Sequence, residues 1–537
     1  MNSGNSSQPQ IHEETHYDGR KMRCLFPRPS GFHGLLEEAV RRNPNGEALI
    51  CGAQRLIYRD LDAEVGRIAA GLAARGVGKG DRVALLLGNR IEFVVLAFAV
   101  SRLGAIWVPL NIRDQILGIT HMLRDSGASL LVAEDDMLDR VPGTDATPAL
   151  QHRIAIGDGA TAGFEPYATL RTGKPIREAV LSGDEDVAAI LYTSGTTGLA
   201  KGAMLTNLGI VHSAMHFGRA MELSEQDRSI VSVPLAHVTG SIAIIAALVG
   251  AAGTVIIMPA FNAAAFLQLA ARERMTHSVL VPAQYHLFLL QPDHHQHDLS
   301  AWRIGGFGGA PMPAVTIGRL AEWLPGLRLM NLYGATETTS PATAMPSSEI
   351  AQRPDSVGLP LECGDIRIME ASGKEAARGT PGEIWIAGPM VVPGYWRNAE
   401  ATAREFSDGY WHSGDIGSMD EDGFVRVFDR LKDVINRGGY KIYTTEVENV
   451  LLAHRDVAEA AAIGKPCPVL GERVHAFIVP REGKTPDLNA IAADCARLLS
   501  DYKVPESFTV CDAPLPRNPN GKVLKRQLRE RLISTLA

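Results

Sequence analysis

Residues 186–202 read DVAAILYTSGTTGLAKG and hold the densest chemical signal in the chain. The apolar run at their start predicts a short buried strand. The loop that follows combines hydroxyl side chains with Gly195 and Gly198, which leave backbone amides open to an anion. Lys201 adds a mobile positive charge that suits phosphate. We interpret the loop as a cradle for a polyphosphate, with a spacing unlike that of the G-x-x-x-x-G-K-[ST] P-loop.

A run of Gly, Ser and Thr is, taken alone, more often a surface turn than a binding loop. The strand ahead of this run and its fixed spacing favour binding. The stretch also resembles the signature of the adenylate-forming enzymes, which include acyl-CoA synthetases, amino-acid-adenylating domains and luciferases. This resemblance continues through most of the chain, from about residue 30 to residue 530.

Size and composition restrict the class of protein. A chain of 537 residues predicts more than one domain. The net charge of −7 predicts no basic surface for a nucleic acid. Six scattered cysteines without a C-x-x-C pair are typical of reduced thiols, and we expect a cytoplasmic location. Residues 1–20 are polar and lack the apolar core of a secretory signal.

Buried strands and helices alternate in the first part of the chain, which predicts largely parallel α/β layers. Residues 241–258 are the most apolar stretch. Gly250 and Gly253 interrupt it, so we expect a buried helix, a turn and a strand rather than a membrane span. Helices are predicted at 32–42, from beyond Leu61 to about 75, and at 91–103. Strands are predicted at 47–50, 82–87, 105–110 and 129–133.

The resemblance implies an α/β fold with two bodies: a large N-terminal domain of layered α/β subdomains and a small, mobile α+β C-terminal domain. We predict a flexible tail at 1–25, the large domain at 26–430, a hinge at 431–433 and a lid domain at 434–537. Lys432 matches the position of the family's hinge.

Two further motifs place small residues after apolar strands. Residues 305–311 read GGFGGAP and residues 329–337 read LMNLYGATE. A carboxylate such as Glu337 after a phosphate loop is a suitable oxygen ligand for Mg²⁺. By resemblance, Tyr333 stacks on adenine, Thr336 contacts the α-phosphate and Glu337 holds the metal. The resemblance implies a nucleotide site formed by Thr193, Ser194, Gly195, Thr196, Thr197, Lys201, Gly309, Ala310, Pro311, Asn331, Tyr333, Gly334, Thr336, Asp415 and Arg430.

Asp415 lies in residues 409–417, GYWHSGDIG, where a carboxylate could accept hydrogen bonds from both ribose hydroxyls. As a turn residue it would need no ligand. Arg430 is expected to reach the ribose as well. Ser413 stands where relatives usually have Thr, and the hydroxyl is kept.

Residues 231–271 contain no Asp, Glu, Lys or Arg. A lone histidine among apolar residues, such as His237, is usually a core residue. In this motif, however, it matches the family's acyl pocket, which the resemblance extends to Val238 and Gly308. The uncharged stretch predicts an acid with no second charge, whether medium-chain fatty, cyclic or aromatic.

The last hundred residues carry two further motifs. Gly438, Gly439 and Lys441 match the loop that lines the family's coenzyme A tunnel, although Lys441 replaces the usual Asn or Gln. Thr444 replaces a common Pro. Residues 516–525, PRNPNGKVLK, present Lys522 at the position of the family's catalytic lysine. Lys525 is the nearest alternative, and a basic C-terminal run is often only a solvated tail.

Taken together, these motifs predict an acyl-CoA ligase that joins a small carboxylic acid to ATP with Mg²⁺ and passes the acyl group to coenzyme A. The alternatives are an amino-acid- or aryl-acid-adenylating enzyme that serves a carrier protein, a luciferase-like oxygenase, and a non-catalytic nucleotide-binding protein. We expect a homodimer, since dimers are common among enzymes.

Overall fold

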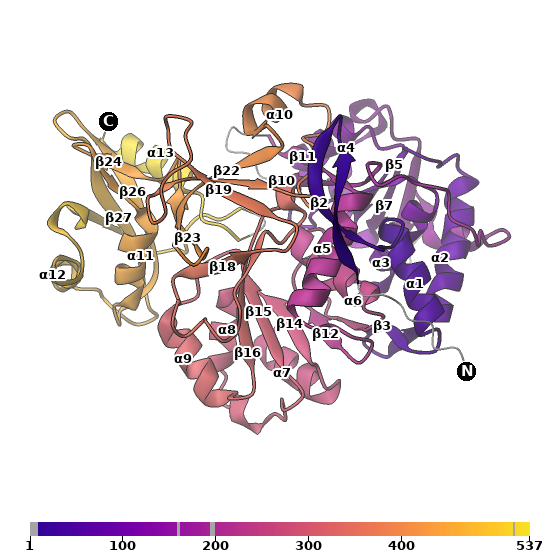
Figure 1. The fold of residues 1–537 in the computed structure, drawn as a ribbon, viewed down its shortest axis with the longest axis horizontal. Coiled ribbons are helices and arrows are strands. Elements are labelled where there is room, and N and C mark those ends of the chain that lie inside the picture. Colours follow the sequence, from indigo (N-terminus) through magenta and orange to yellow (C-terminus); the bar gives the residue numbers. More distant parts are fainter. Residues whose placement is uncertain (1–8, 158–161, 194–198, 519–520, 537) are drawn as a thin grey trace. The chain divides into compact units, whose positions relative to one another are not determined.

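The computed structural model describes residues 9–157, 162–193, 199–518 and 521–536. Contacts divide the chain into two compact units (Figure 1). The N-terminal unit holds residues 1–366 and 386–412, and the C-terminal unit holds residues 367–385 and 413–537. The predicted α/β fold with a large N-terminal and a smaller C-terminal body is confirmed. The contact-based division falls before residue 413, and the strand residues between 413 and 430 pair with each other. The predicted domain boundary at 430 stays a prediction. The hinge at 431–433 stays a prediction.

The first sheet of the N-terminal unit has seven strands and carries the glycine-rich loop at one edge. All neighbouring strands run parallel except the edge pair β10–β11. The apolar residues of its central strands are buried, as continuous apolar runs predict. In order across the sheet, the strands are β11 (Lys201–Thr206), β10 (Val187–Thr193), β6 (Ile106–Pro109), β5 (Arg82–Leu86), β7 (Leu130–Glu134), β8 (His152–Ile156) and β9 (Glu165–Pro166).

The second sheet of this unit has a parallel centre and antiparallel edges. Its strands within the N-terminal unit are β4 (Gln54–Ile57), β3 (Glu47–Cys51), β13 (Thr254–Ile257), β12 (Arg228–Val231), β14 (His277–Leu280), β15 (Ile304–Gly308), β16 (Arg328–Tyr333), β17 (Thr343–Ala344) and β18 (Ser356–Pro360).

Helices cover these sheets with their apolar faces. In α4, for example, Ile119, Met122 and Leu123 have helical spacing and pack on Leu131 and Ala133 of β7 in one buried cluster. The α-helices of this unit are α1 (Phe32–Arg42), α2 (Tyr58–Ala73), α3 (Ile91–Arg102), α4 (Ile116–Ser126), α5 (Asn207–Ala220), α6 (Ala247–Gly250), α7 (Ala263–Arg272), α8 (Pro282–Leu289), α9 (Ala314–Trp323) and α10 (Ala399–Glu405). The shorter turns are the 3-10 helices η1 (Asp135–Arg140), η2 (Thr144–Ala146), η3 (Tyr167–Arg171), η5 (His294–Gln296) and η6 (Thr336–Thr338), and the π-helix η4 (Thr239–Ala246).

Residues 10–26, most of which lie in the predicted flexible tail, form regular secondary structure. Strands β1 (Gln10–His16) and β2 (Arg20–Phe26) form an antiparallel hairpin. Its side chains are tied to the rest of the unit: Arg28 donates to both oxygens of Glu14 at 2.7 Å and to Asp184 at 2.6 Å. Sequence reasoning missed the hairpin because these partners are distant in the chain.

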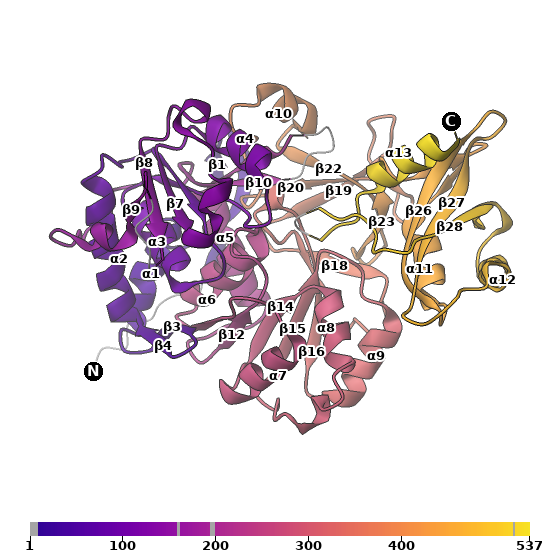
Figure 2. The ribbon, with the colours of Figure 1, turned by 180° about the vertical axis from the view of Figure 1, so that it is seen from behind.

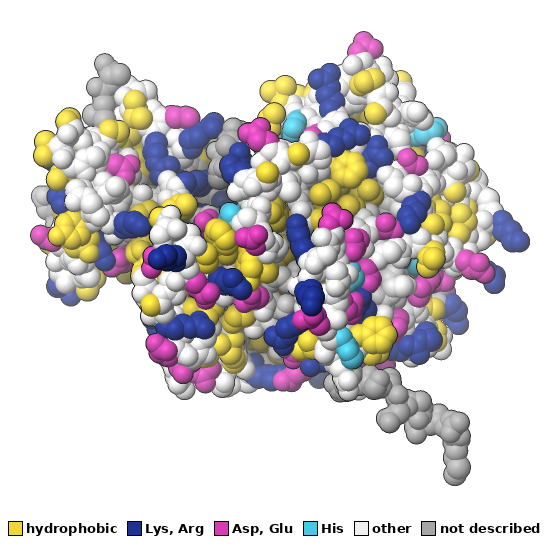
Figure 3. All heavy atoms as spheres, turned by 45° about the horizontal axis from the view of Figure 1, so that its top comes forward, with side chains coloured by type: hydrophobic (Ala, Val, Ile, Leu, Met, Phe, Trp, Pro, Cys, Tyr) yellow, Lys and Arg dark blue, Asp and Glu magenta, His cyan; other side chains and the backbone are white. Residues whose placement is uncertain are grey.

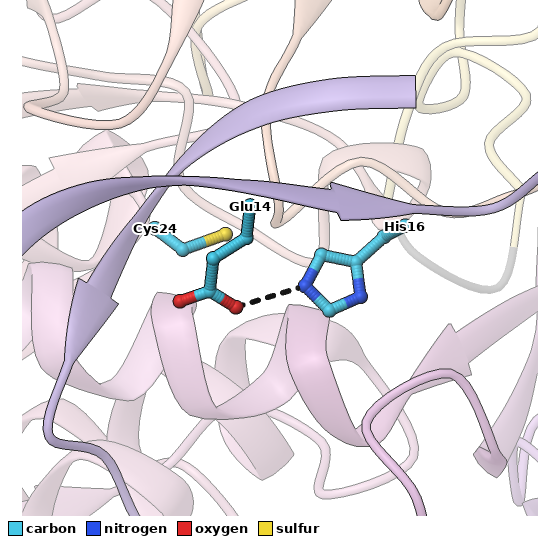
Figure 4. Close-up of side chains that lie close together, drawn as sticks. All are labelled: Glu14, His16 and Cys24. Atoms are coloured by element: carbon cyan, nitrogen blue, oxygen red, sulfur yellow. Dashed lines mark hydrogen bonds and ion pairs between the residues drawn. The ribbon is translucent and has the colours of Figure 1, made fainter. Parts of the chain in front are cut away.

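Glu14, His16 and Cys24 lie close together on this hairpin (Figure 4). The hydrogen bonds from Arg28 lower the pKa of Glu14 to about 2. Burial raises the pKa of Cys24 to about 12, so its thiol stays protonated. Because Arg28 already binds both carboxylate oxygens of Glu14, the cluster of Glu14, His16 and Cys24 serves to anchor the hairpin.

The C-terminal unit contains two sheets. Strands β19 (Asp365–Met369), β20 (Gly382–Ala387), β22 (Tyr410–Met419) and β23 (Val425–Arg430) are neighbours in the first. The short β21 (Phe406–Ser407), which belongs to the N-terminal unit, pairs with the first residues of β22. The second sheet consists of β25 (Tyr440–Ile442), β24 (Ile435–Arg437), β27 (Gly471–Pro480), β26 (Val457–Cys467) and β28 (Ser507–Val510). Its helices are α11 (Thr444–Ala453), α12 (Leu488–Leu498), η7 (Asp501–Lys503) and α13 (Lys525–Leu536).

Side chains along β26 alternate between two buried clusters, so this second sheet is covered on both faces (Figure 2). Ala462 belongs to the cluster that includes α11 and α12. Its neighbours Ala461 and Ile463 belong to a different cluster, with Leu528 of α13. Successive side chains of a strand point to opposite faces, so the two clusters lie on opposite sides of the sheet.

The predicted apolar stretch at 241–258 is a helix followed by a strand, as expected: η4 and α6 precede β13. Among the residues that the structure describes, none belongs to a helix both long and apolar enough to cross a bilayer. Acidic and basic side chains are interspersed over the face drawn in Figure 3.

Candidate active site

Three predicted motifs of the N-terminal unit follow strands of the same sheet. His237 and Val238 lie beyond the end of β12, Gly308 ends β15, and Tyr333 ends β16. These strands run parallel through β14, so their carboxyl ends meet at the same edge. Ligands of open α/β sheets bind at that edge. The sheet therefore brings the predicted adenine and acyl residues to one side.

Thr193 and Lys201 face each other at the mouth of the glycine-rich loop. They are paired in the antiparallel register of β10 and β11, so the loop joins two strands rather than a strand and a helix. This explains why its spacing differs from that of a P-loop. The predicted phosphate ligands Ser194, Gly195, Thr196 and Thr197 lie outside the described residues.

A buried tyrosine connects this loop to the predicted metal ligand. The hydroxyl of Tyr395 contacts Glu337 Oε1 at 2.9 Å and Glu405 Oε2 at 2.7 Å. Lys201 Nζ lies 2.5 Å from the same Glu405 oxygen and 4.1 Å from the centre of the Tyr395 ring. Thr193 Oγ1 lies 3.4 Å from Glu337 Oε1. The structure thus places Thr193, Lys201 and Glu337 in one cluster.

The backbone brings Tyr395 into this position. The backbone of Tyr395 pairs with that of Ala203 of β11 in an isolated β-bridge. Trp396 N–H donates to the carbonyl of Gly202 at 2.7 Å, and Val392 N–H donates to the carbonyl of Glu337 at 2.9 Å. The segment between β20 and α10 is therefore hydrogen-bonded to both the lysine strand and the metal-ligand turn.

The protonation of the cluster follows from its burial and charges. Burial, and then the negative charge of Glu337, raise the pKa of Tyr395 far above its ordinary value, so the phenol keeps its proton. Burial acts to raise the pKa of Glu405, but hydrogen bonds from Lys201, Arg404 and Tyr395 outweigh it and leave the pKa lowered. One phenol proton can be donated fully to only one of the two carboxylates.

Glu337 is the carboxylate that this arrangement leaves without a cation. It is buried, and within the described part of the chain its side-chain contacts are the hydroxyls of Tyr395 and Thr193, with no ion pair. A buried carboxylate is costly unless a positive charge accompanies it. The residues present therefore fit a divalent cation at Glu337.

Asp415 and Arg430 form the second predicted pair, within the C-terminal unit. They are directly opposite each other on β22 and β23, and Arg430 Nε lies 2.7 Å from Asp415 Oδ1. Ser413 Oγ accepts the backbone N–H of Asp415 at 3.0 Å. This bond needs only a hydroxyl, which explains why Ser can replace the usual Thr.

Lys522 and Lys525 differ in their surroundings. Lys522 is exposed on a hairpin in which its backbone N–H and carbonyl bond to Asn518. Lys525 begins α13, and its Nζ lies 2.7 Å from Glu448 Oε1 and donates to Thr444 Oγ1. Lys525 thus holds the unit together.

The profile of the AMP-binding enzyme family matches residues 36–396, and the profile of the AMP-binding enzyme C-terminal domain matches residues 446–522. The chain belongs to the AMP-binding enzyme family. A feruloyl-CoA synthase from Amycolatopsis sp is 36% identical over 494 residues, which are 92% of this chain and 97% of that protein.

Two solved structures are similar to this AMP-binding enzyme over nearly its whole length. The o-succinylbenzoate CoA synthetase of Bacillus subtilis, in complex with its acyl-adenylate intermediate, has a TM-score of 0.82 and 30% identity, and covers 94% of this chain and 98% of its own. The anthranilate CoA ligase AuaEII, in complex with anthranoyl-AMP, has a TM-score of 0.88 and 25% identity, and covers 95% of this chain and 99% of its own.

The family and these relatives identify the reaction class. This AMP-binding enzyme is an ATP-dependent acid–thiol ligase that works through an acyl-adenylate. The predicted family is thereby confirmed, and so is the predicted function at the level of the reaction class.

The adenine and acyl residues have local features that fit their motifs. A Cβ on Gly308 would lie 2.3 Å from the carbonyl oxygen of Leu332, so only glycine allows β15 to pack on β16 here. His237 Nδ1 accepts the N–H of Thr239 at 3.2 Å and lies 3.1 Å from the Thr239 hydroxyl oxygen. Gly309, Ala310 and Pro311 are exposed. The side-chain amide of Asn331 donates to the carbonyl of Ser356. Gly334 and Thr336 complete the predicted set.

The predicted coenzyme A loop is a tight hairpin turn. Gly438 and Gly439 have φ of 60° and 94° and join β24 to β25, so the turn itself requires both glycines. Lys441 is exposed on β25. Lys432 is exposed, and its carbonyl accepts from Arg529 at 3.4 Å.

Sequence reasoning missed Tyr395 and Glu405. They follow the strand β20 by eight residues or more, and no run of Gly, Ser and Thr marks them as phosphate ligands. They join the site through the β-bridge to Ala203 and through α10, which begins at the N-cap Asn398. Only the fold brings them to Lys201 and Glu337.

Replacing Lys525 tests its structural role. We expect Lys525→Met to destabilise the C-terminal unit by about 1–3 kcal/mol, because it leaves the Glu448 carboxylate without its cation. Hydrogen exchange of the full chain should then show faster exchange in α11 and α13. Lys484→Met, at an exposed position of the same unit, is the matched control. Unchanged protection in Lys525→Met would contradict the structural role.

Proposed function

We propose that this AMP-binding enzyme activates an aromatic monocarboxylic acid with ATP and Mg²⁺ and transfers the acyl group to coenzyme A. Three relatives act on or bind feruloyl, anthranoyl and o-succinylbenzoate groups, each of which contains an aromatic ring. Residues 231–271 carry no Lys or Arg to meet a second carboxylate, which supports an acid with one charge.

The partly buried cluster of Thr193, Lys201, Glu337 and Tyr395 is the observation that carries the nucleotide assignment. Thr193, Lys201 and the loop 194–198 bind the phosphates, and Glu337 holds the metal ion. When bound, Mg²⁺ neutralises phosphate charge and draws electrons from the leaving pyrophosphate. Asp415 and Arg430 bind the ribose, and Tyr333 stacks on adenine beside Gly309, Ala310 and Pro311.

In the first half-reaction a carboxylate oxygen attacks the α-phosphorus, and the bond to the bridging oxygen of pyrophosphate breaks. Both reactants are anions, so the site must neutralise charge where they meet. Lys522 supplies its ammonium group to the carboxylate and the α-phosphate, while Lys201 stabilises the departing pyrophosphate. The contribution of these residues is positioning and electrostatic stabilisation. His237, Val238 and Gly308 orient the acyl group.

In the second half-reaction the thiol of coenzyme A attacks the acyl carbon, and AMP leaves. Lys522 has no role in this step. We assign the loop of Gly438, Gly439 and Lys441 to the thiol substrate, and Lys432 to the hinge about which the C-terminal domain turns. A homodimer and a cytoplasmic location belong to the same proposal.

A panel of acids in an assay of AMP release that depends on coenzyme A tests the substrate class. We expect cinnamate- and benzoate-type acids to exceed octanoate in kcat/KM by about tenfold or more, because a rigid ring loses little conformational freedom on binding. Malonate and amino acids should be poor substrates. A dicarboxylate or an amino acid as the best substrate would refute the proposed class. AMP release without any need for the thiol would point instead to a carrier protein or an oxygenase.

A further inference from the structure

Lys201 is already saturated by protein groups in this structure. Its Nζ lies 2.5 Å from Glu405 Oε2 and 4.1 Å from the centre of the Tyr395 ring, and its side chain is 11% exposed. An ammonium group held this way has little charge to offer a further anion. We propose that Glu405 is a positioning residue that takes the place of nucleotide phosphate on Lys201 and is exchanged for it when ATP binds. This inference rests on the assignment of Lys201 to the phosphates of ATP.

The charge of the cluster argues for an exchange rather than for simultaneous binding. Lys201 and Glu405 neutralise each other. The negatively charged Glu337 lies nearby, because the Tyr395 hydroxyl contacts both carboxylates. Left unchanged, this group offers no net positive charge to a triphosphate. Once Lys201 leaves Glu405, the carboxylate keeps two donors: Arg404 Nη2, 2.9 Å from Oε1, and the Tyr395 hydroxyl. Glu405 is therefore still hydrogen-bonded after the lysine has moved.

The fold holds Glu405 in a defined place for this exchange. It is the last residue of α10, whose first turn is capped by Asn398 accepting the N–H of Ala401 at 3.0 Å. Thr402 of the same helix accepts the N–H of Tyr395 at 3.0 Å. The carboxylate and the aromatic ring that contact Lys201 are thus fixed to each other, while the lysine has a flexible four-carbon stem.

Two consequences follow for the reaction. ATP must break the Lys201–Glu405 ion pair to bind, so Glu405 weakens nucleotide affinity. After the adenylate forms, Glu405 competes with pyrophosphate for Lys201 and so favours its release. Release of product commonly limits turnover, and a competing carboxylate accelerates it.

Direct titration of MgATP into the full chain without acid tests the proposal. We expect Glu405→Gln to bind MgATP about three- to tenfold more tightly than the wild type, the range that loss of one partly buried ion pair allows. Magnesium pyrophosphate should inhibit this variant more strongly in the same proportion. Glu400→Gln removes one charge from an exposed position of the same helix and should change neither value.

A double-mutant cycle separates an effect of Glu405 through Lys201 from a direct effect of its charge on the nucleotide. Glu405→Gln should have no effect on MgATP affinity when Lys201 is Met, whereas a general effect would persist. Glu405→Asp keeps the charge on a shorter side chain, so its MgATP affinity should lie between those of the wild type and Glu405→Gln. This variant replaces Glu405→Gln if the latter fails to fold. Unchanged or weaker MgATP binding in these variants would overturn the proposal. If the wild type itself bound no MgATP, the assignment of Lys201 to phosphate would fail instead.

Discussion

Lys522→Ala is expected to lower the rate of adenylate formation about 10²- to 10³-fold, the usual loss when one group that stabilises transition-state charge is removed. Thioester formation from a supplied acyl-adenylate and coenzyme A should stay close to the wild-type rate, because the carboxylate is already activated. ATP–pyrophosphate exchange measures the first half-reaction, and disappearance of the synthetic adenylate measures the second.

Two controls sharpen this result. Lys484→Ala removes an exposed lysine from the same unit and should affect neither half-reaction. Lys525→Met should reduce stability but retain a measurable exchange reaction, because Lys525 is bonded to Glu448 and Thr444. An equal fall of both half-reactions in Lys522→Ala would show that Lys522 supports folding or binding in general.

Glu337→Gln is the second variant with a large expected effect. The amide keeps the shape of the side chain but removes the charge that would hold a divalent cation, so adenylation should fall about 10²- to 10³-fold. The Mg²⁺ concentration needed for half-maximal exchange should rise. Folding should be preserved, since an amide can still accept the hydroxyl proton of Tyr395.

Glu322→Gln is the matched control for this variant, because Glu322 is an exposed carboxylate of the same unit. It should leave the Mg²⁺ requirement unchanged. A Glu337→Gln enzyme with wild-type exchange at low Mg²⁺ would place the metal on other ligands.

Much of the local structure was predictable from sequence patterns. Helix 32–42 has the predicted bounds. The strand predicted at 82–87 ends one residue earlier, and the strand predicted at 129–133 is shifted by one residue, to 130–134. These elements have strong apolar periodicity, and they pack through the side chains that make the pattern. The hairpin at 10–26 was missed because its stability comes from Arg28, Asp184 and other partners far along the chain.

The candidate site divides in the same way. Residues on motif loops, such as Lys201, Glu337 and Asp415, were recognisable because small residues after a strand form a pattern along the chain. The ion pairs Lys201–Glu405 and Lys525–Glu448 were not, because their partners lie 204 and 77 positions apart. A contact of that kind depends on how separate elements pack.

The sequence by itself determined the family, the reaction class and the loops that carry the nucleotide motifs, because each of these is written in short runs of adjacent residues. The tertiary structure alone decided which groups those loops meet. It placed Tyr395 between two carboxylates, bonded Lys201 to Glu405 and tied Lys525 to Glu448. The physical reason is that charge and hydrogen bonding act over a few ångströms in space, whatever the separation along the chain.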